Sequence, residues 1–184
     1  MDDSQQLLLW RWSTIVQLMS VAMATAFFAL LARASRRAEL RSWMRAWFAN
    51  FLALVVTSLY WVLQPASLFP LVSALYLAAK AVFVVLLIQG VWLMTHRSVR
   101  WYTTRQIAAG VAIYAVIGAV LCRDLVSLGI LQHTVLGVTL LAVAIATWRF
   151  QRDGVQWLAA GIGIRGLLSL SEAFAYVLQA VPGA

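Results

Sequence analysis

Three ionisable side chains lie inside long apolar runs, and they are the residues of this sequence best suited to chemistry. They are Lys80, Arg165 and Glu172. A charge at the centre of a bilayer costs about 2.5 to 3.5 kcal/mol on insertion scales, so each one needs a partner, water or a route to the interface. These residue types predict either an intramembrane ion pair or a polar chamber that binds a small ligand.

The charges belong to two polar stripes with helical spacing. One stripe contains Ser73, Tyr76 and Lys80, and the other contains Arg165, Ser169, Glu172 and Tyr176. Residues three or four apart share one helix face, and lipid offers polar side chains no hydrogen bonds, so both stripes should face the interior of a helix bundle. Because Lys80 and Glu172 lie at comparable depth, we expect them to be in contact. The alternative is a structural pair that only fixes helix packing.

The two histidines differ in depth. His133 lies at the level of the proposed chamber, so it is a further candidate for the polar network. His96 lies at the cytoplasmic end of the third predicted span, whereas His133 lies in the outer half of the fifth. This mismatch argues against a shared metal or a bis-histidine haem, and the single cysteine, Cys122, cannot form a cysteine metal cluster. We expect neither a metal nor a cofactor.

Composition identifies the solvent as lipid. Of 184 residues, 64% are hydrophobic and only 11% are charged, which lies outside the range of soluble domains. Each crossing of a ~30 Å hydrocarbon core needs about 20 apolar residues. The sequence predicts one all-α domain, a polytopic transmembrane helix bundle with six spans, at about 12–32, 44–63, 71–94, 106–121, 125–147 and 155–180.

The arginines set the predicted orientation. Ten of the 14 cations fall in three of the connections between spans, and positive connections stay in the cytoplasm. We therefore expect a multi-pass protein of the bacterial inner membrane with its N-terminus outside. Six spans would also leave the C-terminus outside, so we expect a seventh span after Ala184 in a longer, seven-span protein.

The familiar catalytic and nucleic-acid signals are absent. The sequence has no phosphate-binding glycine loop, HExxH motif, nucleophile elbow or paired catalytic carboxylates. We therefore expect no enzymatic activity in this chain. The net charge of +8 is explained by topology, so we expect no nucleic acid as a partner.

Two segments carry a resemblance to a known class of proteins. They are ALLARASRRAELRSWMRAWFANFLAL and ALYLAAKAVFVVLLIQGVW. The pattern over residues 30–92 resembles the N-terminal membrane region of bacterial signalling proteins, chiefly GGDEF diguanylate cyclases and some sensor histidine kinases. This resemblance implies a sensor that leads into a cytoplasmic output domain. No GGDEF signature or kinase motif is present, so the resemblance assigns no catalytic residue.

The sequence thus favours a membrane sensory module that regulates a cyclase or kinase domain. Its expected partners are the lipid bilayer, a small amphipathic or acidic ligand, and a second copy of the chain. Two alternatives remain: a small transporter or channel subunit, and a membrane assembly subunit. A continuous polar track through both halves of the bundle would favour transport, whereas a chamber closed toward the cytoplasm would favour sensing.

Overall fold

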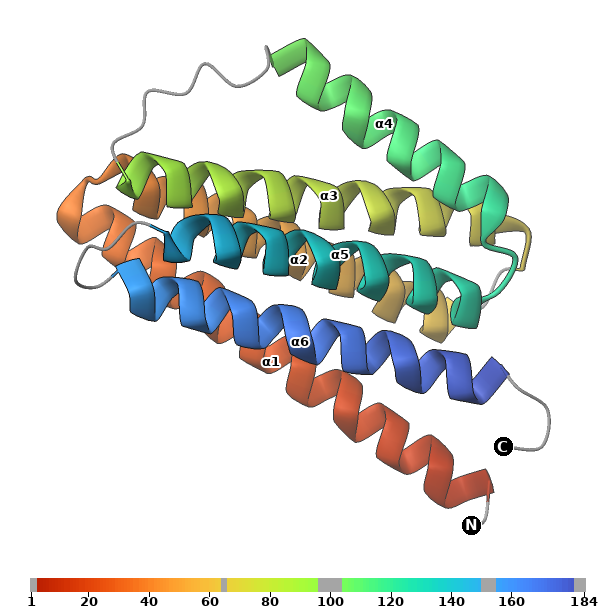
Figure 1. The fold of residues 1–184 in the computed structure, drawn as a ribbon. Helices are drawn as coiled ribbons and strands as arrows, with labels where there is room; N and C mark the ends of the chain where they lie inside the picture. Colours follow the sequence, from red (N-terminus) through yellow and green to blue (C-terminus); the bar gives the residue numbers. More distant parts are fainter. Residues whose placement is uncertain (1–2, 64–65, 96–103, 150–154, 181–184) are drawn as a thin grey trace. The chain divides into compact units, whose positions relative to one another are not determined.

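The computed structural model is all-helical over the residues that it describes, 3–63, 66–95, 104–149 and 155–180. Six α-helices and one short 3-10 helix follow each other along these residues (Figure 1). The elements are α1 (Asp3–Ser35), α2 (Ala38–Leu63), η1 (Ala66–Leu68), α3 (Phe69–Met94), α4 (Thr104–Leu121), α5 (Leu125–Trp148) and α6 (Val155–Ala180).

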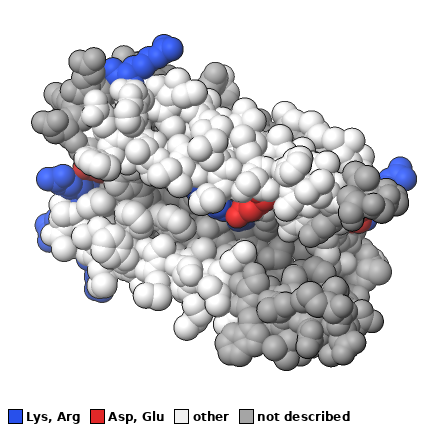
Figure 2. Space-filling view, turned by 60° about the horizontal axis from the view of Figure 1, so that its bottom comes forward, with Lys and Arg blue, Asp and Glu red and all other residues white. Residues whose placement is uncertain are grey.

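Each predicted span lies within one of these helices, and the predicted all-α fold is confirmed over the described residues. Four helical segments are long and apolar enough to cross a membrane: Ile15–Ser35, Phe69–Met94, Leu125–Trp148 and Val155–Leu178. The apolar segment Arg105–Leu121 is shorter. On the face drawn in Figure 2, most of the described surface carries neither acidic nor basic side chains. These features fit a membrane helix bundle.

The chain divides into two compact units, Met1–Gly90 and Val91–Ala184. In the first unit, α1 and α2 are joined by a tight corner at Arg36, whose φ of 49° is left-handed. The guanidinium of Arg41 donates a hydrogen bond of 3.0 Å to the Arg36 carbonyl oxygen. This bond stabilises a corner that has no glycine to adopt the left-handed conformation.

Aromatic and polar contacts hold α2 against its neighbours in the first unit. The Phe28 ring of α1 stacks on Trp47 with centroids 6.2 Å apart, and Trp47 meets Phe83 of α3 at 5.6 Å. The Ser42 hydroxyl donates to the Leu86 carbonyl at 2.7 Å. A side chain at Gly90 would overlap the indole of Trp43, so this glycine lets α2 and α3 approach closely.

In the second unit, α5 and α6 lie side by side (Figure 1). Glycines line their contact. A Cβ atom at Gly137 would lie 2.7 Å from Leu170 Cγ and 3.0 Å from the Gly166 carbonyl oxygen, and one at Gly166 would lie 3.0 Å from Leu141 Cγ. Small residues let membrane helices approach until their backbones nearly touch. The two helices therefore form a tight pair on which polar side chains can be positioned.

Asp124 begins α5 with a capping box. Its carboxylate accepts a hydrogen bond of 2.7 Å from the Ser127 amide, and the amide and hydroxyl of Ser127 lower the pKa of this carboxyl. A group with a lowered pKa stabilises the fold above its unfolded pKa, and this contribution is lost as the pH falls through the folded pKa.

We expect Asp124→Ala to lower the free energy of unfolding by about 1 kcal/mol near neutral pH, with a smaller difference from the native chain in acid. Asp124→Ser should retain most of the stability, because serine also caps helices. Thermal unfolding in detergent as a function of pH checks both variants. Equal losses in the two variants would contradict a capping role.

Candidate functional site

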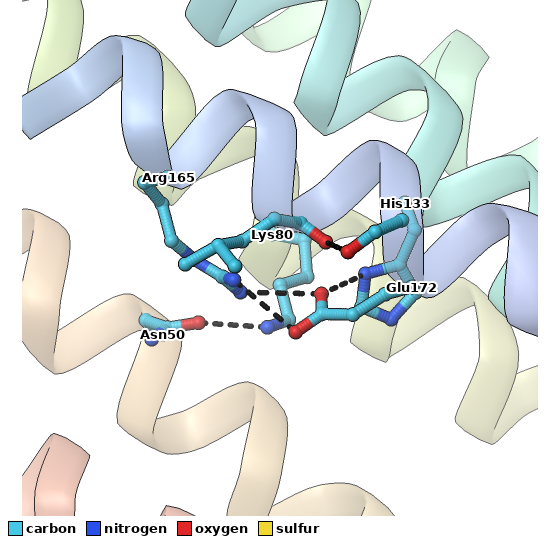
Figure 3. A network of polar contacts seen from close by, with 7 residues as sticks. Asn50, Lys80, His133, Arg165 and Glu172 are labelled. Carbon is cyan, nitrogen blue, oxygen red and sulfur yellow. Dashed lines mark hydrogen bonds and ion pairs between the residues drawn. The ribbon is translucent and has the colours of Figure 1, made fainter.

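Glu172 is the centre of a polar cluster on α5 and α6. Its Oε2 lies 2.7 Å from Nδ1 of His133. Its Oε1 and Oε2 accept hydrogen bonds from Arg165, at 3.2 Å from Nη1 and 3.5 Å from Nη2 (Figure 3). We call His133, Arg165 and Glu172 the α5–α6 cluster. Its carboxylate is shared between an imidazole on one helix and a guanidinium on the other.

Helical geometry explains how these side chains meet. Arg165 and Glu172 are separated by two turns of α6 and lie on one face of it, about 10 Å apart along the axis, a gap that their two side chains span. His133 and Glu172 each lie about 12 Å from one end of their helix, counted from Leu125 and Ala180 at 1.5 Å per residue. In an antiparallel pair this places them at the same level.

Two further residues of the predicted polar stripe, Ser169 and Tyr176, lie on the same helix as Arg165 and Glu172. The Tyr176 ring stacks on His133 with centroids 5.6 Å apart, and it occupies the space where Gly129 lacks a side chain. Ser169 lies between Arg165 and Glu172 in sequence, is fully buried, and its hydroxyl has no hydrogen-bond partner among the described residues. Tyr176 thus packs against the imidazole, and Ser169 is a buried hydroxyl on the same helix.

The three side chains of the cluster differ in exposure. The side chains of Arg165 and Glu172 are 46% and 38% exposed, whereas that of His133 is 16% exposed. Exposed apolar residues, among them Ile164 and Leu168, lie next to them on α6. The guanidinium and the carboxylate are therefore more exposed than the imidazole that contacts Glu172.

Comparison with known protein families, curated proteins and solved structures found no match. The function of the chain is therefore inferred from the chemistry of its polar sites. Over the described residues, no three histidine, cysteine, aspartate or glutamate side chains are grouped so that they could hold a metal ion. The expected absence of a cofactor remains a prediction.

A second polar site lies in the first unit, between α2 and α3. The Lys80 ammonium donates a hydrogen bond of 2.8 Å to Oδ1 of Asn50 (Figure 3) and lies 5.4 Å from the centroid of the Tyr76 ring. The predicted stripe of α3 therefore brings Tyr76 and Lys80 together. The hydroxyl of Ser73, the third member of that stripe, donates to the Pro70 carbonyl of its own helix at 3.0 Å.

The structure brings some of the predicted site residues together and leaves one predicted contact untested. His133, Arg165, Glu172, Tyr176 and Ser169 lie on neighbouring turns of α5 and α6. The contact between Lys80 and Glu172 would join the two units and stays a prediction. The guanidinium of Arg165 points along α6 toward Glu172. His96 lies outside the described residues.

One member of the polar sites was missed. Asn50 lies outside the two stripes that were predicted around the ionisable residues. Its signal was present: an amide near the middle of the predicted second span is as unusual as a charge, since lipid cannot satisfy its hydrogen bonds. Applying this rule to every polar side chain at mid-span would have selected Asn50 as a partner for an intramembrane cation.

Proposed function

We propose that the chain is a six-span sensory module of the bacterial inner membrane, with its N-terminus outside, in which the α5–α6 cluster responds to a ligand. The orientation is supported by the arginines, which gather at the connections between alternate helices. The resemblance of residues 30–92 to signalling proteins supports an output domain in the cytoplasm, a cyclase or a kinase.

The observation that supports the sensing role is that the Glu172 carboxylate contacts both Arg165 and His133, at different distances. Its hydrogen bonds to Arg165 are long, at 3.2 and 3.5 Å, whereas the His133 contact is short, at 2.7 Å. An acidic head group that approaches the exposed guanidinium would compete with Glu172 for it. Arginine suits this exchange because its planar guanidinium binds carboxylate or phosphate with two parallel hydrogen bonds.

Such an exchange would change the contact between two helices. When Glu172 loses Arg165, which lies on the same helix, its remaining partner is His133 on α5, so the carboxylate is then held only by the contact that joins α5 and α6. A ligand shifts a conformational equilibrium only through different affinities for two states. Here the ligand-bound state is the one in which Arg165 is free of Glu172. The apolar surroundings of Arg165 favour a small acidic amphiphile as the signal.

Binding of a fluorescent long-chain fatty acid tests this proposal. The full chain is placed in nanodiscs of zwitterionic lipid, and the affinity is measured by fluorescence anisotropy. We expect Arg165→Gln to weaken binding at least tenfold, because a hydrogen bond to a charged group contributes about 1.5 to 3 kcal/mol.

Arg149→Gln is the matched control, because it removes an exposed arginine at the C-terminal end of α5, outside the cluster. The same loss of affinity in both variants, or none in Arg165→Gln, would overturn the proposal. Flux of the fatty acid across proteoliposomes, abolished by Arg165→Gln, would favour the alternative of a transporter subunit.

A further inference from the structure

The corner between α1 and α2 carries a concentration of positive charge. Residues 33–45 contain five arginines and a single acidic residue, Glu39. Glu39 lies 3.9 Å from Arg37, at the limit of an ion pair, and leaves most of this charge uncompensated. The arginines are exposed at the end of α1, at the corner and along the first turns of α2.

Two of these arginines begin an exposed stripe that changes from charged to apolar along α2. Arg41 and Arg45 are one turn apart, and the same face continues with Phe48 and Leu52, whose exposed fractions are 52% and 43%. Side chains four residues apart on a helix have Cβ atoms about 5–6 Å from each other. Both guanidinium groups can therefore reach one phosphate group.

The dimensions of this stripe match those of a phospholipid. Leu52 lies about 10 Å along the helix axis from Arg45, at 1.5 Å per residue. A phosphate bound at the arginines would place the first part of an acyl chain against Phe48 and Leu52. The position of one guanidinium is also fixed, because Nη1 of Arg41 is hydrogen-bonded to the carbonyl of Arg36, so less side-chain freedom is lost on binding.

We propose that the stripe formed by Arg41, Arg45, Phe48 and Leu52 is a binding site for an anionic phospholipid of the leaflet at that end of the bundle. The arginines bind the phosphate, and the apolar residues pack along one acyl chain. This site is separate from the α5–α6 cluster and does not depend on the sensing role. It differs from a general attraction of cations to an anionic surface because it needs two guanidinium groups in register with an apolar face.

Lipid titration of the full chain, followed by native mass spectrometry from detergent, tests this site. Phosphatidylglycerol and phosphatidylcholine with identical acyl chains are compared. We expect selective retention of phosphatidylglycerol, and we expect Arg41→Gln combined with Arg45→Gln to weaken it roughly 30-fold, the factor that corresponds to about 1 kcal/mol per cation.

Two control variants separate the site from its alternatives. Arg105→Gln combined with Arg149→Gln removes two exposed arginines from the second unit and should leave the binding within about twofold, since an isolated surface charge contributes little. Arg41→Lys combined with Arg45→Lys keeps the charge but removes the two-pronged geometry, so it should weaken binding several-fold. Circular dichroism verifies that each variant retains its helices.

Three results would overturn the proposal. The first is an equal loss of affinity in the two glutamine pairs, which would indicate a delocalised surface charge. The second is unchanged binding in the lysine pair. The third is complete displacement of the lipid by millimolar inorganic phosphate, which would identify a soluble anion as the occupant.

Discussion

Replacing Glu172 with leucine should lower the free energy of unfolding by about 2 to 3 kcal/mol, because Arg165 then remains as a charge without its carboxylate at mid-membrane depth. Glu172 accepts both hydrogen bonds of the Arg165 guanidinium and the contact from His133. Arg165 and Glu172 are two helical turns apart on α6. The variant therefore loses all three of these contacts.

The ion pair between Arg165 and Glu172 also predicts the stability of the double variant. Glu172→Leu combined with Arg165→Leu should recover most of the lost stability, since replacing both members of a pair with apolar residues is often close to neutral. Unfolding in mixed micelles, titrated with a denaturing detergent, measures all three variants. Additive losses would show that Arg165 and Glu172 are not coupled. Ser171→Ala is the control, because its exposed hydroxyl bonds only to the Leu168 carbonyl of its own helix.

The glycine contact between α5 and α6 should be equally sensitive. Gly166→Val introduces atoms where a Cβ already lies 3.0 Å from Leu141 Cγ and 3.1 Å from both the Gly137 carbonyl and the Leu141 amide nitrogen. The backbone atoms cannot move aside without separating the helices. Overpacking of this kind costs about 1 to 3 kcal/mol, and it should also weaken the His133–Glu172 contact.

The same helix offers a matched control for this substitution. A Cβ at Gly161 meets no atom within 4 Å outside its own backbone, so Gly161→Val should change the unfolding free energy by less than about 0.5 kcal/mol, as for surface substitutions in general. Detergent-titrated unfolding compares the two variants directly. Equal effects would mean that the cost arises from valine in a helix, and the close helix contact would be contradicted.

The sequence predicted the helices well, because a long apolar run with helical periodicity has few alternatives. It placed the starts of the first two helices too late, at about residues 12 and 44, whereas α1 begins at Asp3 and α2 at Ala38. A hydropathy criterion finds where lipid begins, but the helices continue through their polar ends. The corner at Arg36, with φ of 49°, also had no signal, since arginine is not a residue that favours this conformation.

The sequence selected the residues that meet around Glu172, but it did not predict the pair that His133 forms with Glu172. Helical spacing correctly placed Glu172 and Tyr176 on one face of α6. The role of His133 as a direct partner of Glu172 depends on the register of α5 against α6, which glycine contacts set. Sequence spacing within one helix cannot give that register. Counting residues from the helix ends would have suggested this register, because His133 is as far from Leu125 as Glu172 is from Ala180.

The most direct test of the α5–α6 cluster as a ligand-responsive element is the ¹⁵N NMR signal of His133. The sequence has two histidines, so His96→Gln leaves a single labelled imidazole in the full chain, observed in nanodiscs of zwitterionic lipid. We predict that a long-chain fatty acid shifts the Nδ1 resonance, and that Arg165→Gln abolishes this shift. A fatty acid that binds while the His133 resonance stays unchanged would contradict the proposed response.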